Sequence, residues 1–337
     1  MKAIMIPKPH KIEVIDVERP IINDTEILVK VRAVGICASE VHAFEGTHPW
    51  RVPPVISGHE FSGSIVEVGK KVKGFSAGDS VTACPIATCD ICEYCLAGRD
   101  NICDNIRILG TPKWPGPFAE YVRIPYSTAY RLPSSLTFEE GALIEPLTVG
   151  LHTVNRSSIK RGQFVAVLGA GAIGLCTLIV AKHLEVTSII SDIVDSKLDK
   201  AKSLGADFII NPKSEELYKI VRDVTKNKGV DVAIDCAGVS KSLTDSLSLV
   251  KKGGTVVVTA LFKKSVEMDP GTITTRELDV RGAILYTKAE FKKAVSLSKG
   301  VRTDLRQLIT HRMHFEDAEE AFGLMQKGEA IRIMLSP

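Results

Sequence analysis

Residues 163–192 read QFVAVLGAGAIGLCTLIVAKHLEVTSIISD, and this stretch decides the fold. It opens with an apolar run of strand length at 164–168, which passes directly into a G-x-G-x-x-G turn and a helical stretch. In such a turn the first glycine permits a tight bend, the second lets the backbone approach a pyrophosphate, and the third lets the helix pack closely on the sheet. The N–H groups at the helix N-terminus also favour phosphate. The residues of this turn that we expect to bind a cofactor are Gly169, Gly171, Ala172, Ile173 and Gly174.

A second expected strand, 187–191, ends at Asp192, 18 residues beyond Gly174. An acidic residue at about this distance accepts hydrogen bonds from the adenosine ribose, so the stretch predicts dinucleotide binding. Residues 164–181 carry no charge and are long enough to suggest a membrane span. Three glycines at phosphate-loop spacing argue against a straight helix there, and we expect a protein without membrane contact.

The composition is that of a globular protein with room for about two domains, since 337 residues are 45% apolar and 25% charged. A net charge of +3 without a long basic run does not favour nucleic acid as a partner. The apolar stretch at the N-terminus is too short for a secretory signal, so we expect a cytoplasmic location. In that reducing compartment the eight cysteines are better metal ligands than disulfide partners.

Four of these cysteines follow the spacing Cys-x2-Cys-x2-Cys-x7-Cys. Four thiolates so spaced can close a tetrahedron around one zinc ion and leave no coordination position open, which predicts a structural zinc site. An iron–sulfur cluster is the competing use of four cysteines. The four residues are Cys89, Cys92, Cys95 and Cys103.

A second set of donors is spread over the segments 35–42, 58–60 and 143–150. Together these segments offer sulfur, nitrogen and oxygen atoms of the kinds that bind zinc. Taken singly, each residue also fits an ordinary place in a core or on a surface. The donors are Cys37, His59, Glu60 and Glu145.

Short β-branched runs separated by proline and glycine continue to about residue 81 and predict a mostly antiparallel β region. From residue 164 onward, strands alternate with helical stretches, which predicts a doubly wound parallel sheet. Two further helices and two strands after residue 286 should return to the first region. We therefore expect one domain at 1–146 with 287–337, and a nucleotide domain at 147–286. The strands expected in the nucleotide domain are 164–168, 187–191, 207–210, 230–235, 255–260 and 278–284.

Taken together, the motifs resemble the zinc-dependent medium-chain dehydrogenase/reductase family, the alcohol dehydrogenase superfamily, and most closely its sorbitol/polyol and threonine dehydrogenase branch. The resemblance covers essentially the whole chain. It implies an α/β protein with a mostly-β GroES-like catalytic domain and a Rossmann domain, catalytic and structural Zn2+, NAD, and a homo-oligomer that is a dimer or a tetramer. Its carriers are GICASEVH at 35–42, GHEFSG at 58–63, the cysteines at 89–103, EPLTVGLH at 145–152, GAGAIG at 169–174 and THRMHFEDAEEAFGLMQKG at 310–328.

The resemblance also implies a role for each candidate residue of the catalytic site. Cys37, His59 and Glu145 match ligands of the catalytic zinc, with glutamate at the last position as in the sorbitol branch. Glu60 matches a glutamate that binds zinc transiently or through water. Ser39 matches the hydroxyl group that takes the substrate proton.

Four other positions follow from the same resemblance. His42 matches the outer end of the proton relay. Asp192 and Lys197 match the pair that holds the adenosine ribose. Arg332 matches an arginine near the pyrophosphate.

The chain departs from the sorbitol branch where that branch places substrate-binding groups. Ala43 replaces a tyrosine, and Leu285-Tyr286 replaces an arginine–tyrosine pair, so sorbitol itself is in doubt as the substrate. Glu40 replaces an aspartate and should keep its hydrogen bond to His59. Several residues of one set around the expected zinc should line the substrate cleft, although its two tryptophans fit surface or packing positions equally well. The set is Ala43, Phe44, Trp50, Trp114, Phe118 and Leu285.

The expected activity is oxidation of a secondary alcohol of the polyol, diol or sugar-acid type with NAD. An L-threonine 3-dehydrogenase is the main alternative. A zinc-free quinone reductase would lack Cys37 and His59, and a non-catalytic dinucleotide-binding protein would be expected to lose metal ligands or the relay. None of these residues is lost.

Overall fold

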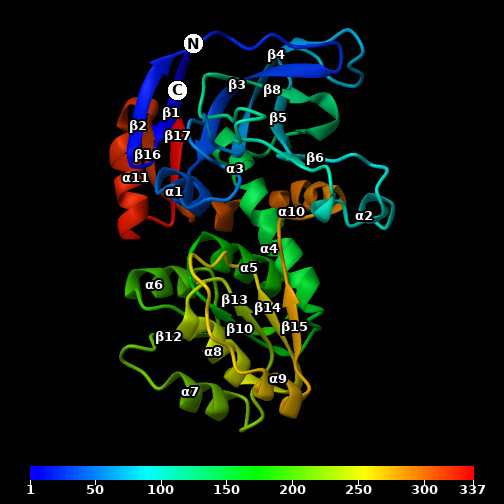
Figure 1. Cartoon of the computed structure of the whole chain (residues 1–337). Coiled ribbons are helices and arrows are strands. Elements are labelled where there is room, and N and C mark those ends of the chain that lie inside the picture. The colour runs from blue at the N-terminus through cyan, green and yellow to red at the C-terminus, as the bar shows by residue number, and fades with distance from the viewer. The chain divides into compact units, whose positions relative to one another are not determined.

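The computed structural model describes residues 1–337 and divides the chain into two compact units (Figure 1). The first unit comprises Met1–Glu145 and Tyr286–Pro337, and the second comprises Pro146–Leu285. Each of these bounds differs by one residue from the bounds expected for the two domains. None of the helices combines the length and the apolar character needed to cross a membrane.

The second unit is built on a six-stranded parallel sheet in the order β12-β11-β10-β13-β14-β15. The expected doubly wound parallel sheet is confirmed, and β10, β11 and β13 have the bounds expected from the sequence. The strands are β10 (Phe164–Leu168), β11 (Thr187–Ser191), β12 (Phe208–Ile210), β13 (Val230–Asp235), β14 (Val250–Val258) and β15 (Asp279–Gly282). The helices are α4 (Ile144–Ser157), which begins in the first unit, α5 (Ala172–Lys182), α6 (Asp195–Ser203), α7 (Leu217–Val224), α8 (Ser240–Leu249) and α9 (Pro270–Arg276).

The glycine turn joins β10 to α5 at the point where the strand order reverses, between β10 and β13. Ligands of open α/β sheets bind at this point. Gly169 has a φ of +107°, a conformation that disfavours other residues. A Cβ on Gly174 would lie 1.8 Å from the carbonyl oxygen of Gly169. Glycine is therefore required at both positions for α5 to start directly at the end of the strand.

The first unit contains a seven-stranded sheet with the path β16-β17-β3-β4-β5-β9, in which β8 also pairs with β3. Strand β17, near the C-terminus, pairs antiparallel with β3, so the end of the chain completes the sheet that the N-terminal part begins. Its strands are β3 (Glu26–Gly35), β4 (Glu60–Val68), β5 (Ser80–Ala83), β8 (Tyr121–Pro125), β9 (Ala129–Arg131), β16 (Ile309–His314) and β17 (Arg332–Ser336). Two small sheets pair β1 (Lys2–Lys8) with β2 (Lys11–Asp16), and β6 (Ile86–Ala87) with β7 (Arg107–Ile108).

Helices cover the sheet of the first unit and enclose an aromatic and aliphatic core. The first of the two helices expected after residue 286 spans Lys288–Arg306. The helices of this unit are α1 (Ala38–Phe44), α2 (Glu93–Leu96), α3 (Phe138–Ala142), α10 (Lys288–Arg306) and α11 (Ala318–Lys327), with 3-10 turns at Asp100–Ile102, Tyr126–Thr128 and Phe315–Asp317. The largest apolar side chains of the core include Phe61, Phe118, Phe315 and Phe322.

Candidate metal centres and dinucleotide site

The donors expected for a catalytic metal converge in the first unit. Donor atoms of His59, Glu60 and Glu145 lie within 4.8 Å of one another, and those of Cys37, Glu40 and His59 form a second group within the same limit. Three separate elements bring them together: the N-terminal end of α1, the start of β4 and the first turn of α4. His59 belongs to both groups and joins them into one cluster.

Glu40 orients the cluster through both of its carboxylate oxygens. Oε1 lies 2.8 Å from His59 Nδ1 and accepts from Arg51 Nε and Ser57 Oγ, each at 3.2 Å. Oε2 accepts from the main-chain N–H of Cys37 at 3.0 Å. The expected hydrogen bond between Glu40 and His59 is thus confirmed. Because it occupies Nδ1 of His59, it leaves Nε2 as the nitrogen available to a metal.

The charges around His59 favour the forms of its neighbours that bind zinc. Burial would raise the pKa of Glu40, but the charges of His59 and Arg51 lower it to about 2. Burial likewise opposes ionisation of Cys37, while its hydrogen bond and charge interaction with His59 lower the pKa of the thiol to about 7. The thiolate is the form of cysteine that binds metals, so Cys37 is prepared for this role.

Glu60 is fully buried, and neither of its carboxylate oxygens receives a hydrogen bond. Arg332 Nη1 lies 2.9 Å from Oε1 as an ion-pair partner and donates to the carbonyl oxygen of Ile36 at 2.7 Å. Burial raises the pKa of Glu60 well above its ordinary value, and the guanidinium opposes this rise. A Cβ at Gly35 would lie 2.5 Å from Oε2, so glycine makes room for the carboxylate. Buried oxygens without hydrogen bonds suit a bound cation, and the residues therefore fit a zinc ion.

Arg332 is only 1% exposed, and these contacts place it beside the metal-ligand cluster. Sequence reasoning did not foresee this ion pair. The contact with a cofactor pyrophosphate that the resemblance implied for Arg332 stays a prediction.

Glu145 is held by Tyr286, which sequence reasoning considered only as part of a substrate-binding pair. The Tyr286 hydroxyl donates to Glu145 Oε1 at 2.6 Å, and both residues are buried. Burial and the negative charge of Glu145 raise the pKa of Tyr286 well above its ordinary value. The phenol thus keeps its proton and remains a hydrogen-bond donor to the carboxylate.

The two relay residues lie on α1, three positions apart and therefore on one face of the helix. Ser39 Oγ is 3.5 Å from Glu40 Oε2, a weak contact that leaves the hydroxyl largely available. The main-chain oxygen of His42 accepts from the N–H groups of Thr47 and His48. These bonds hold the loop after α1 against the helix.

His48 is a buried residue that the sequence did not single out. Its Nδ1 accepts from the main-chain N–H groups of Trp50 at 3.1 Å and Arg51 at 3.0 Å. Burial, together with the charge of Arg51, lowers the pKa of His48 to about 4. The neutral imidazole therefore shapes the loop that presents Arg51 to Glu40.

The residues expected to line the substrate cleft are mostly core residues. Ala43 and Phe118 are fully buried, and Trp114 is 6% exposed, with its indole N–H donating to the carbonyl oxygen of Arg123. Phe44 packs against the same core. A place for these side chains along a substrate cleft stays a prediction, because the pattern of aromatic residues does not distinguish a cleft from a sheet interior. Trp50, by contrast, is exposed and packs edge-on against His48.

The second unit offers a dinucleotide site at the glycine turn. A Cβ on Gly171 would meet no atom within 4 Å, so open space adjoins the first turn of α5, as a pyrophosphate requires. Asp192 Oδ2 accepts from the main-chain N–H of Ala170 at 2.7 Å, which fixes the carboxylate at the turn. Lys197 lies in the first turn of α6 and is half-buried. These residues fit a nicotinamide dinucleotide.

Asp192 leads us to expect a preference for NAD over NADP. Its charge would repel a 2′-phosphate, and Ile193 and Val194 offer no cation in return. The ratio of kcat/KM for NAD to that for NADP should be about 10 or more, which corresponds to roughly 1.4 kcal/mol. In Asp192→Asn, which keeps the acceptor and removes the charge, the ratio should fall. Equal kcat/KM values for the two cofactors in the wild type would show that Asp192 does not select between them.

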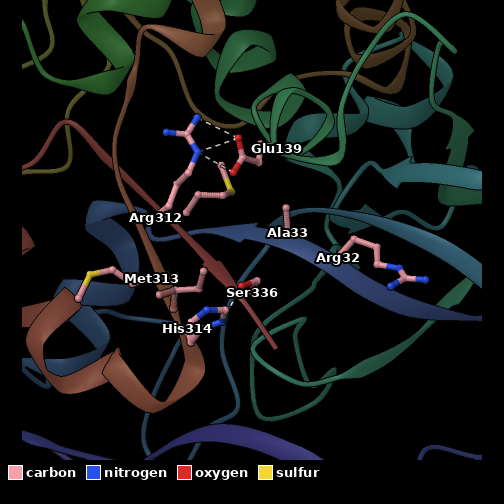
Figure 2. Close-up of a pocket in the computed structure, with 9 residues that line it drawn as sticks. Arg32, Ala33, Glu139, Arg312, Met313, His314 and Ser336 are labelled. Carbon is pink, nitrogen blue, oxygen red and sulfur yellow. Dashed lines mark hydrogen bonds and ion pairs between the residues drawn. The ribbon is translucent and has the colours of Figure 1, made fainter.

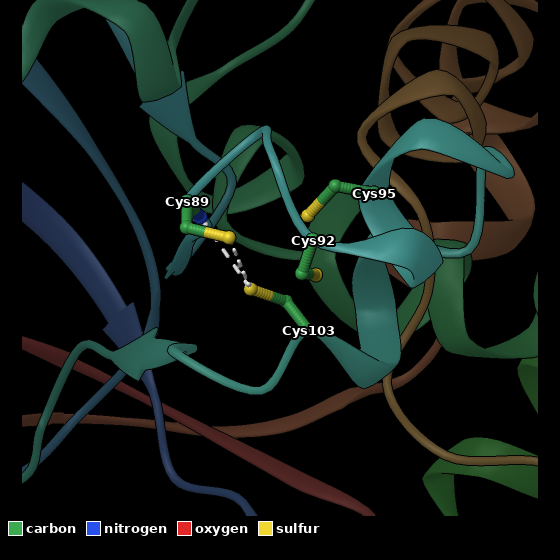
Figure 3. A group of neighbouring side chains, drawn as sticks. All are labelled: Cys89, Cys92, Cys95 and Cys103. Carbon is green, nitrogen blue, oxygen red and sulfur yellow. Dashed lines mark hydrogen bonds between the residues drawn. The ribbon is translucent and has the colours of Figure 1, made fainter.

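The four cysteines lie together in a loop that we call the four-cysteine lobe, residues 89–103 (Figure 3). Their sulfur atoms are within 4.8 Å of one another. The main-chain N–H groups of Ile91 and Cys92 lower the pKa of Cys89 to about 6, whereas burial and neighbouring thiols raise that of Cys95 to about 12. Four thiolates at this spacing require a cation to offset their charge, so the lobe fits a structural zinc ion.

A separate pocket of about 230 Å3 opens on the first unit where β3, β16 and β17 meet (Figure 2). Arg312 points to Glu139 there and makes a two-pronged ion pair with its carboxylate. His314 Nδ1 lies 3.1 Å from Ser336 Oγ. The pocket contains none of the metal-ligand candidates.

Comparison with known proteins identifies the family of the chain. Residues 23–134 match the alcohol dehydrogenase GroES-like domain, and residues 172–300 match the zinc-binding dehydrogenase domain. Sorbitol dehydrogenase of Bacillus subtilis (strain 168) is 33% identical over 344 residues, which cover 100% of this chain and 97% of that protein.

Two solved structures share the whole fold. The 2R,3R-butanediol dehydrogenase of Bacillus subtilis superposes with a TM-score of 0.92 at 30% identity, over 100% of this chain and 99% of that one. A Sinorhizobium meliloti protein with bound NADP has a TM-score of 0.92 at 34% identity, over 100% and 99% of the two chains. The chain therefore belongs to the zinc-dependent medium-chain dehydrogenase/reductase family.

Proposed function

We propose that this protein transfers a hydride between a secondary alcohol of the polyol, diol or sugar-acid type and NAD, with zinc as the catalytic metal. The cluster of half-buried Cys37 with buried His59, Glu60 and Glu145 carries the proposal, because its donors suit zinc and Glu60 has oxygens without hydrogen bonds. The kind of alcohol is suggested by the sorbitol and butanediol dehydrogenases that the chain resembles.

Residues of the first unit would bind the metal and transfer the proton of the substrate. Cys37, His59 and Glu145, with Glu60 alongside, would hold a zinc ion, whose charge lowers the pKa of a coordinated hydroxyl group. The Ser39 hydroxyl would receive the proton of the substrate and pass it toward His42 on the same face of α1.

The second unit supplies the position of the cofactor. The turn from Gly169 to Gly174 would bind the pyrophosphate through main-chain N–H groups, and Asp192 would accept hydrogen bonds from the ribose. Hydride acceptance is the chemistry of the nicotinamide, so the protein contributes orientation and electrostatics.

A substrate panel with NAD tests the proposal and should show sorbitol to be a poor substrate. Leu285 lacks the hydrogen-bond donors of an arginine, and the Tyr286 hydroxyl is engaged by Glu145. An unpaired polar group costs roughly 1–3 kcal/mol, so kcat/KM for sorbitol should be at least about 10-fold below the best value in the panel. The panel should include xylitol, 2,3-butanediol, aldonates and L-threonine.

Two results of the substrate panel would contradict parts of the proposal. No turnover of any alcohol by zinc-loaded protein would refute the proposed activity. Sorbitol turnover equal to the best substrate would refute only the argument from Leu285 and Tyr286.

We further propose a cytoplasmic homo-oligomer, either a dimer or a tetramer. None of the eight cysteines forms a disulfide, which suits a reducing compartment. Strand β15 is the edge of its sheet and exposes Val280, a feature that favours pairing with another copy. Sedimentation equilibrium of the purified protein would give the state directly.

A further inference from the structure

Three consecutive residues, 286–288, contact both candidate metal sites of the first unit. At one end, the Tyr286 hydroxyl donates to Glu145 Oε1 at 2.6 Å. At the other end, the main-chain N–H of Lys288 donates to Asp100 Oδ2 at 3.2 Å, and its ammonium group pairs with Asp90. Both aspartates belong to the four-cysteine lobe. The segment is therefore a direct physical connection from the lobe to Glu145.

The connection is stiff. Thr287 caps α10 by accepting from the main-chain N–H of Glu290 at 3.2 Å, and Glu290 bonds back to the N–H of Thr287 at 2.9 Å. The ring of Phe291 lies 5.8 Å from that of Tyr286 and 5.0 Å from that of Tyr130. A shift of one end of the segment must therefore move the other end, because the turn between them cannot bend freely.

The contact with the lobe is also more than a surface ion pair. Asp100 is buried, and its Oδ2 receives the main-chain N–H of Lys288 and lies 3.9 Å from the ammonium group. A buried carboxylate that loses its hydrogen-bond partners is destabilised by its desolvation free energy. Asp100 should therefore move together with Lys288 when that residue shifts. The ammonium group reaches a second carboxylate, Asp90, which directly follows Cys89.

We infer that Tyr286 and Lys288 are positioning residues through which the four-cysteine lobe holds Glu145 in the geometry that the catalytic metal requires. The inference rests on the proposed function only in taking Glu145 as a ligand of that metal, and on no particular substrate. Because the segment joins the lobe to Glu145, the two metal sites are coupled. Disturbing the contact between Lys288 and the lobe should therefore change the metal affinity of the catalytic site.

Metal titration tests the inference without measuring turnover. Protein depleted of catalytic zinc, with the lobe zinc retained, is titrated with Co2+ against a competing chelator, and the visible spectrum of the cobalt protein is recorded. Tyr286→Phe should bind Co2+ about 10-fold more weakly than the wild type, as is typical when a partner of a ligand is lost. Lys288→Met should show a smaller loss and the same spectral change, and Lys288→Arg should restore both.

The controls separate coupling from general damage. Lys292→Met, an exposed change one turn along α10, should leave Co2+ affinity and spectrum unchanged. In the double variant of Tyr286→Phe and Lys288→Met the affinity should equal that of Tyr286→Phe alone, because Lys288 acts through Tyr286.

Wild-type affinity in Lys288→Met, or losses that simply multiply in the double variant, would overturn the inference and leave the proposed function intact. A Cys37→Ser variant identifies the site that is titrated. If Cys37→Ser leaves the cobalt signal unchanged, the proposed metal centre is itself wrong and the inference falls with it.

Discussion

Replacing Cys95 with serine should lower the melting temperature of the protein by on the order of 10 °C or more. Cys95 is one of four sulfur donors that lie within 4.8 Å of one another, and the lobe around them has only the short helix α2, without a buried residue, and a 3-10 turn whose buried residues, Asp100 and Asn101, are polar. With so little apolar packing of its own, the lobe must depend on the metal for its fold. Removal of one thiolate weakens metal binding, and the loss of binding free energy is a loss of folding free energy.

Calorimetry combined with metal analysis measures this effect. Cys84→Ser is a suitable control, since Cys84 is a buried cysteine outside the spacing of the four ligands. It should cost far less stability and keep the full zinc content. A Cys95→Ser protein that melts like the wild type and contains as much zinc would show that the lobe is not a metal site.

The second large effect is expected at Arg332. Arg332→Met leaves the buried carboxyl group of Glu60 without its ion-pair partner, and breaking such a pair typically costs about 3–5 kcal/mol. Bound zinc would supply a replacing positive charge. The loss should therefore be larger in protein stripped by a chelator than in the zinc-loaded protein.

Urea unfolding of both forms measures the difference. Arg312→Met is a matched control, because Arg312 also pairs with a glutamate of the first unit but is 53% exposed, and it should cost less than about 1 kcal/mol. Adding Glu60→Gln to Arg332→Met should recover part of the stability. Equal losses for the two arginine variants would mean that the Glu60–Arg332 pair behaves as a surface contact.

The fold of the second unit was predictable because its signals are local. Each of β10, β11 and β13 is a short segment rich in β-branched or apolar residues that glycine or aspartate follows within a few residues, and these strands have the expected bounds. The candidate metal ligands could be proposed from the sequence for a related reason, since their spacing and residue types are visible along the chain, and the structure brings their donor atoms together.

The contacts that orient the ligands were not predictable. Tyr286 and Glu145 are 141 positions apart, and the amino-acid sequence around either residue does not indicate the other as its partner. The same holds for Arg332, whose guanidinium reaches Glu60 only because β17 pairs with β3. The cleft residues stay a prediction for the opposite reason: an aromatic residue such as Phe118 has the same pattern in a core as in a binding site.

Gly35 has no functional atom of its own, yet the carboxylate of Glu60 occupies the volume that any side chain at this position would need. In a scan of all single substitutions, even alanine at position 35 must displace the Glu60 carboxylate, so this position should score with the candidate metal ligands rather than with ordinary strand residues. Loss of activity alone would then misassign it as part of the chemistry. The position is sensitive because of the space that the carboxylate needs. The same explanation applies wherever a substitution scan finds a sensitive glycine beside a buried carboxylate.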